Sequence, residues 1–137
     1  MGHDFITYGQ RHVHMKDLDI WTLRQLLYRE ACEVGSDDLG DGATLDALRT
    51  WLASWEWIGP GVVTGTELAD FVQQQPQRQQ ALAALLRRTR DRLQDWAPQI
   101  PLDFLKEHVN TPQVSFVVPL PTDRFIKKIS AILQLLE

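Results

Sequence analysis

The amino-acid sequence predicts a predominantly helical α+β domain, in which about five to six helices pack with a small antiparallel sheet. Several segments repeat apolar residues at helical spacing, and two short segments are rich in β-branched and aromatic residues. The chain has 137 residues, of which 44% are hydrophobic and 23% are charged. This length and balance supply one core and exclude a disordered chain. Residues 1–137 are therefore expected to form a single globular domain.

The first half of the chain is predicted to form a hairpin and two helices. β-branched and aromatic residues surround Gly9-Gln10, which is typical of two short strands joined by a turn. Aspartate and threonine residues precede the two helical patterns and can act as their N-caps. The expected elements are a hairpin over residues 4–15, a helix over 18–34 capped by Asp17 or Asp19 and closed by Gly35, a glycine–aspartate loop over 36–43, and a helix over 45–57 capped by Thr44 and stopped by Gly59-Pro60.

The second half is predicted to contain four more helices and one strand. Thr64 and Glu67 have the spacing of a capping box, which predicts a helix start. Proline residues end the later segments, because proline lacks a backbone N–H and restricts the residue before it. The expected elements are a short helix to Gln74, a helix over 77–96, a short helix over 101–109, a strand over Gln113–Val118 that pairs with the N-terminal strands, and a last helix from about Asp123 to the C-terminus that is capped by Thr122.

The helix over 18–34 is predicted to use two neighbouring faces. Its core face is an apolar stripe, and a second stripe of Trp21, Tyr28 and Cys32 lies beside it. Arg24 falls between the two stripes, where its stem covers apolar surface or its guanidinium stacks on the rings. Arginine, tryptophan and tyrosine also dominate binding energy at interfaces, so Arg24 and Tyr28 are candidate partner contacts. Cys32, the single cysteine, is expected to be an unreactive thiol on an apolar flank.

Three tryptophans lie within seven residues, at positions 51, 55 and 57. Trp51 and Trp55 share a face of the predicted helix with leucines, so both are expected in the core. Trp57 falls on the opposite side and must be covered by residues 59–65, by another element or by a partner. The five tryptophans of the chain are expected to exceed what the interior can enclose.

The charge pattern favours an acidic surface loop. The net charge is −4, and residues 30–46 contain six acids and no lysine or arginine. Asp37, Asp38 and Asp41 lack the alternating spacing and the final glutamate of a calcium-binding EF-hand loop. They are therefore expected to be solvated and able to attract a basic partner. The arginines of residues 77–96 are dispersed around their helix, so a nucleic-acid partner is not expected.

The sequence contains no signature of a catalytic, cofactor or metal centre. His12 and His14 point to one face of a strand, but two ligands do not complete a metal site. The glycine-rich segment over residues 59–65 lacks the patterns of phosphate-binding loops. No cofactor is predicted. A membrane span and a secretory signal are also missing, so a cytoplasmic protein is expected.

These observations favour a protein-binding module over an enzyme. In size and charge the chain is similar to small bacterial immunity proteins, which suggests an immunity-type or antitoxin-type inhibitor that occludes a partner protein. Asp37, Asp38 and Asp41 would speed the encounter. Two alternatives remain: a ligand-binding domain or enzyme with a pocket between the tryptophan-rich helix and residues 59–65, and a self-associating subunit that forms a homo-oligomer through the sheet edge or the last helix. The anchors of the favoured complex would be Arg24, Tyr28 and Trp57.

Overall fold

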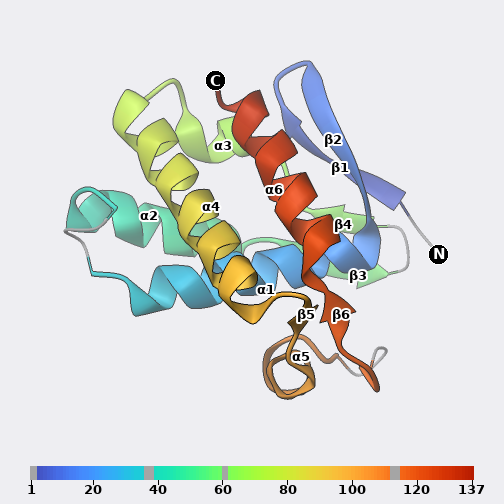
Figure 1. Ribbon diagram of the computed structural model, residues 1–137. Helices are drawn as coiled ribbons and strands as arrows, with labels where there is room; N and C mark the ends of the chain where they lie inside the picture. Colours follow the sequence, from blue (N-terminus) through green and yellow to red (C-terminus); the bar gives the residue numbers. More distant parts are fainter. Residues whose placement is uncertain (1–2, 36–38, 60–61, 112–114) are drawn as a thin grey trace.

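A computed structural model describes residues 3–35, 39–59, 62–111 and 115–137, with side chains described except at 3–4, 57–59 and 62–64 (Figure 1). The described part is predominantly helical with short antiparallel strand pairs, which confirms the predicted fold class. Its elements are β1 (His3–Tyr8), β2 (Arg11–Lys16), α1 (Asp17–Glu33), α2 (Gly42–Ala53), β3 (Glu56–Gly59), β4 (Val62–Thr64), α3 (Leu68–Val72), α4 (Pro76–Trp96), β5 (Gln99–Ile100), α5 (Leu102–His108), β6 (Leu120–Pro121) and α6 (Thr122–Leu135).

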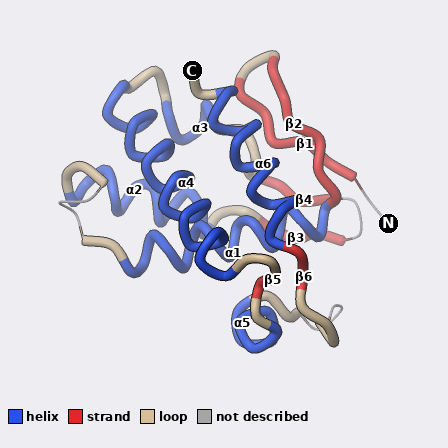
Figure 2. Tube along the Cα trace, viewed as in Figure 1, coloured by secondary structure: helices blue, strands red, loops and turns tan. Residues whose placement is uncertain are grey.

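The N-terminal hairpin forms as predicted (Figure 2). β1 and β2 pair antiparallel around a two-residue turn, in which Gly9 adopts a φ of +64°. Such left-handed backbone suits glycine because it has no Cβ. Ile6 and Met15 are buried on the inner face, whereas Phe5 is exposed on the outer face. The alternation of apolar and polar residues therefore sets which face of the hairpin meets the core.

α2 begins three residues earlier than the sequence predicted. The N-cap is Asp41, whose Oδ1 accepts a hydrogen bond of 2.7 Å from the backbone N–H of Thr44. Thr44 itself is buried in the first turn, so its assignment as the cap is wrong. The helix also ends at Ala53, earlier than the predicted Trp57. Both aspartate and threonine are common N-cap residues. Because Thr44 and Leu45 are buried, Thr44 lies inside the first turn and Asp41 is left as the cap.

The segment after α2 forms a strand pair where the sequence predicted a helix end and a loop. β3 pairs antiparallel with β4, and Trp57 lies opposite Val63 in the register. Thr64 is therefore a strand residue and not a helix cap. The N-cap of α3 is Glu67, whose side chain accepts a hydrogen bond from the N–H of Ala69. The capping-box pattern instead predicted that the Glu67 side chain would accept a hydrogen bond from the backbone N–H of Thr64.

The predicted pairing of Gln113–Val118 with the N-terminal strands is wrong for residues 115–118, and residues 113–114 lie outside the described part. Val117 and Val118 are 78% and 61% exposed, whereas Phe116 is buried. The backbone N–H of Phe116 donates to the Asn110 side chain instead of to a strand. β6 begins at Leu120 and pairs with β5, so the described strands form three separate two-stranded sheets. Prolines 119 and 121 cannot donate to a ladder, which limits the length of β6.

α4 and α6 lie side by side across the front of the molecule, with α1 and α2 behind them and the hairpin beside α6 (Figure 1). The apolar stripes predicted for these helices form the core. Trp51, Trp96 and Ile126 pack against this core but are only partly buried. No described helix combines the length and hydropathy needed to cross a bilayer. The buried stripe residues are Ile20, Leu23, Leu27, Ala31 and Val34 in and after α1, Leu82, Leu85, Leu86 and Leu93 in α4, and Phe125, Ile129, Ile132, Leu133 and Leu136 in and after α6.

Gly65 is predicted to be a stability determinant. Its φ is +91°, and a Cβ there would lie 3.0 Å from Trp55 Cδ1 and 3.2 Å from Trp55 Cα. Gly65→Ala should therefore lower the free energy of unfolding by about 1–3 kcal/mol, measured by urea denaturation. Gly35→Ala is the matched control, because that Cβ would meet nothing within 4 Å. Equal effects of the two substitutions would contradict the close approach to Trp55.

Candidate functional site

Trp21, Arg24 and Tyr28 form a stacked cluster on one flank of α1. The Arg24 Cζ lies 5.2 Å from the centroid of the Trp21 ring and 4.8 Å from that of the Tyr28 ring. Its Nε donates a hydrogen bond of 2.8 Å to the backbone carbonyl of Leu52, and its Nη1 donates to the Gln25 side chain. Of the two placements that the sequence left open for Arg24, the structure has the guanidinium stacked on the two rings. All three members of the cluster are half-buried, so each presents part of its surface to solvent.

The environment of Arg24 fixes the guanidinium in place. Burial lowers its pKa from the ordinary arginine value, although arginine stays charged at any physiological pH. The carbonyl of Leu52 belongs to the last turn of α2, where free carbonyls carry partial negative charge. Arg24 therefore satisfies a helix end and holds a cation–π cluster rigid at the same time.

The acidic loop was predicted to contribute three carboxylates. Asp37 and Asp38 lie outside the described residues, as does the side chain of Trp57. Asp41 is exposed, but it is also the N-cap of α2. Hydrogen bonds from Thr44 lower the pKa of its carboxyl below the ordinary value. Asp41 is therefore a structural residue as well as a candidate surface acid.

Cys32 differs from the expectation. It follows Tyr28 by one helical turn but is exposed, so its placement on a covered apolar flank is wrong. Trp21 and Tyr28 of the same stripe are partly buried, so the stripe becomes exposed toward the C-terminal end of α1. The single thiol is thus accessible to solvent.

Trp55 lies in the core, as predicted, and Trp51 packs against the core. Their rings meet edge to face with centroids 5.2 Å apart, and Trp51 also stacks on Phe71 at 5.5 Å. Trp55 is 2% exposed, whereas Trp51 is half-buried. The cavity that touches both rings holds only about 10 Å³. The described residues thus leave no ligand-sized space against Trp51 and Trp55, and the side of the predicted pocket formed by residues 59–64 lies outside the described side chains.

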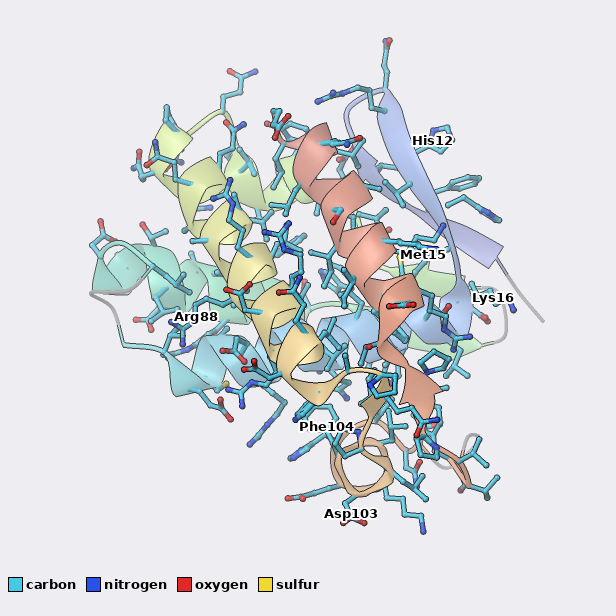
Figure 3. The ribbon with its side chains drawn as sticks, viewed as in Figure 1. His12, Met15, Lys16, Arg88, Asp103 and Phe104 are labelled. Carbon is cyan, nitrogen blue, oxygen red and sulfur yellow. The ribbon has the colours of Figure 1, made fainter. Side chains whose placement is uncertain are left out.

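His12 and His14 lie exposed on the outer face of β2. Phe5 lies opposite His14 in the register, and its ring centroid is 4.8 Å from that of His12 and 5.2 Å from that of His14. Figure 3 shows His12 directed away from the body of the domain and Met15 directed inward. Among the described side chains, no group of three or more His, Cys, Asp or Glu could hold a metal ion.

An ionic network between α1 and α4 was not predicted. The Glu30 side chain is 7% exposed and is approached by Arg92 Nε at 3.1 Å and by Arg88 Nη2 at 3.5 Å. Arg92 Nη2 also contacts the carboxylate of Glu33 at 2.7 Å. The hydrogen bond to Glu30 raises the pKa of the Arg92 guanidinium. Figure 3 places Arg88 on the side of α4 next to α1.

Aromatic side chains continue this network toward α5. The Trp96 and Phe104 rings lie 5.0 Å apart, the Phe104 and His108 rings lie 4.8 Å apart, and the Arg92 Cζ is 6.0 Å from the Trp96 ring. Together with the network they enclose a cleft of about 100 Å³. Figure 3 shows Phe104 on α5 below the end of α4. The cleft is lined by Leu26, Arg29, Glu30, Glu33, Thr89, Arg92, Trp96, Phe104 and His108.

Part of this site had a signal in the sequence. Arg88 and Arg92 have i, i+4 spacing and so project to one side of α4. The acids Glu30 and Glu33 are likewise one turn apart on α1. Nothing in the local pattern pairs the two helices, because that pairing depends on how α1 and α4 cross.

Comparison with protein-family models, curated proteins and solved structures finds no match to this chain.

The cap at Asp41 predicts a specific acid sensitivity. Asp41→Ala should lower the Tm at neutral pH, because it removes the acceptor for the Thr44 N–H. The pKa of Asp41 is depressed, so its contribution is complete above the ordinary aspartate value and is lost as the pH falls through its folded-state pKa. The difference in Tm between wild type and Asp41→Ala should therefore narrow in acid, measured by thermal unfolding. Asp46→Ala, at an exposed acid of the same helix, should change the Tm much less.

The Glu30 network predicts a contrast between two neighbouring acids. Glu30→Gln should lower the free energy of unfolding by about 1–3 kcal/mol, because a buried carboxylate loses two ion pairs. Glu33 is 51% exposed, and Glu33→Gln should cost less than about 0.5 kcal/mol. Both losses of unfolding free energy are measured by urea denaturation at low and high salt. Added salt should reduce only the small loss caused by Glu33→Gln, because the Glu33 carboxylate is exposed. Equal losses would contradict the buried role of Glu30.

Proposed function

We propose that this protein is a protein-binding module that inhibits a partner protein by occluding its surface, in the manner of a bacterial immunity protein or an antitoxin. The observation that carries the proposal is the rigid, partly exposed cluster of Trp21, Arg24 and Tyr28. Tryptophan, tyrosine and arginine are the residue types that dominate binding energy in protein interfaces. The proposed role is a binding role and not a catalytic one.

The rigidity of the cluster supports tight binding. Ordering a flexible arginine on association costs conformational entropy, and Arg24 is ordered before any partner arrives. Its Nε donates to the carbonyl of Leu52, and its Cζ lies over the rings of Trp21 and Tyr28. The cluster would therefore be an anchor whose shape changes little on binding.

Charge suggests the chemistry of the partner. Asp37 and Asp38 follow α1 in the sequence, and Asp41 and Asp46 are exposed at the start of α2. The net charge of the chain is −4. A partner with a basic patch beside an apolar hollow would complement this surface, and the acids would increase the association rate. We place the complex in the cytoplasm, and nucleic acid is not the proposed partner.

The anchor role of Tyr28 is tested on a captured partner. The immobilised full chain captures proteins from the lysate of its source, and the Kd of the purified partner is then measured by calorimetry. Tyr28→Ala should weaken binding by about thirtyfold or more, as expected for a hot-spot residue. Tyr8→Ala is the matched control, because Tyr8 is also half-buried but lies at the hairpin. An unchanged Kd for Tyr28→Ala would refute the proposed surface.

The acidic loop is tested by kinetics on the same complex. Asp37→Lys combined with Asp38→Lys should slow association at low salt and leave the dissociation rate nearly unchanged. Asp41 is left intact, because its substitution would also disturb the cap of α2. An association rate that does not respond to the double substitution at low salt would remove the electrostatic part of the proposal.

A further inference from the structure

We infer that the cleft between α1, α4 and α5 binds a short-chain monocarboxylate, with Arg29 as the residue that holds the carboxylate. The cleft combines a cation, aromatic walls and a volume of about 100 Å³. It lies on the other flank of α1 from the Trp21, Arg24 and Tyr28 cluster. The inference therefore does not depend on the proposed protein partner.

The charge balance of the cleft leaves one cation without a counter-ion. Glu30 is engaged by both Arg88 and Arg92, and Glu33 is engaged by Arg92. Arg29 also lines the cleft, yet within the described residues it forms no salt bridge and no side-chain hydrogen bond. A guanidinium with free donors binds a carboxylate through two parallel N–H···O bonds. The cleft thus presents an anion site next to a carboxylate network that is already neutralised.

The walls of the cleft suit an apolar tail. Leu26, Trp96 and Phe104 line it, and Trp96 and Phe104 are each partly covered by the rest of the core. The Thr89 hydroxyl donates to the carbonyl of Leu85, so it does not present a free donor to a ligand. A carboxylate with an alkyl chain therefore fits better than inorganic phosphate, which would bring a second negative charge close to Glu33 and no apolar surface.

The volume sets an upper limit on the ligand. A cleft of about 100 Å³ is smaller than the engineered cavity of about 150 Å³ that binds benzene, and it corresponds to roughly three waters of liquid. The carboxylate and the first carbons of propionate or butyrate fill this space, and the end of the chain extends out of it because the cleft is open to solvent. His108 lies at the edge of the cleft with its Nε2 3.6 Å from Glu107 Oε1, which places a second polar group near the ligand.

The test is an NMR titration of the full chain with sodium butyrate. The indole N–H signal of Trp96, assigned with the Trp96→Phe variant, reports on the cleft. Butyrate should shift this signal saturably in the millimolar range, whereas sodium chloride at equal ionic strength should not. Arg29→Gln should weaken binding by about tenfold or more, the loss expected for a charge-assisted hydrogen bond. Arg87→Gln is the matched control, since Arg87 is an exposed arginine of α4 that lies outside the cleft.

Each other outcome overturns the inference. Shifts that do not saturate, or that equal those produced by chloride, mean that butyrate acts only as a salt. Equal affinity in Arg29→Gln removes the assigned anchor, and stronger binding of butylamine than of butyrate reverses the assigned charge. Urea denaturation checks that Arg29→Gln remains folded. If it does not, Arg29→Lys retains the charge but not the planar fork, and it should bind butyrate more weakly than wild type.

Discussion

The burial of one stripe of α4 organises the rest of the molecule. Leu82, Leu85 and Leu86 are at most 1% exposed, and α4 contacts α1, α2, α3, α6 and β5. Once this stripe faces inward, the helical period determines where every other residue of α4 points. Arg88 and Arg92 then lie along α1, where the buried carboxylate of Glu30 meets them. The cleft at the end of α4 is thus a consequence of the phase of one amphipathic helix.

Arginines of one element repeatedly satisfy the end of another helix. The last turns of α1, α2, α3 and α6, all within the described chain, contain no basic residue. Free carbonyls at a helix end need donors, and a cation there also interacts favourably with the helix dipole. Each of these ends is met by an arginine from elsewhere: Arg49 donates to Ala31 and Val34 at the end of α1, Arg24 to Leu52 of α2, Arg78 to Phe71 of α3, and Arg11 to Leu135 of α6. The dispersed arginines of the sequence are therefore partly tertiary helix caps.

Local patterns predicted the helices well, but tertiary context decided the sheets. The 3.6-residue period located α1, α4 and α6 to within a residue or two at their starts. The segment QVSFVV has high strand propensity, yet in its described part, residues 115–118, Phe116 is buried and Val117 is exposed. Strand propensity describes a fit to a half-buried pleated surface, and no such surface is available to residues 115–118. The candidate sites show the same contrast. Arg24 and Tyr28 lie on one helix, so the helical period alone predicts that they are neighbours. Glu30 and Arg92 lie on different helices, so their ion pair depends on how α1 and α4 pack.

The two candidate surfaces are separated by the core face of α1. Arg24 lies on the flank toward α2, and Glu30 lies on the flank toward α4, with the buried stripe of Leu23 and Leu27 between them. Packed interiors transmit strain, so a ligand in the cleft could influence the opposite flank only by moving α1 as a body. α1 is held against such movement on both sides, by Arg24 and Arg49 at α2 and by Arg92 at α4. Binding of a carboxylate and binding of a protein partner should therefore be thermodynamically independent, because the contacts on both flanks hold α1 in one position.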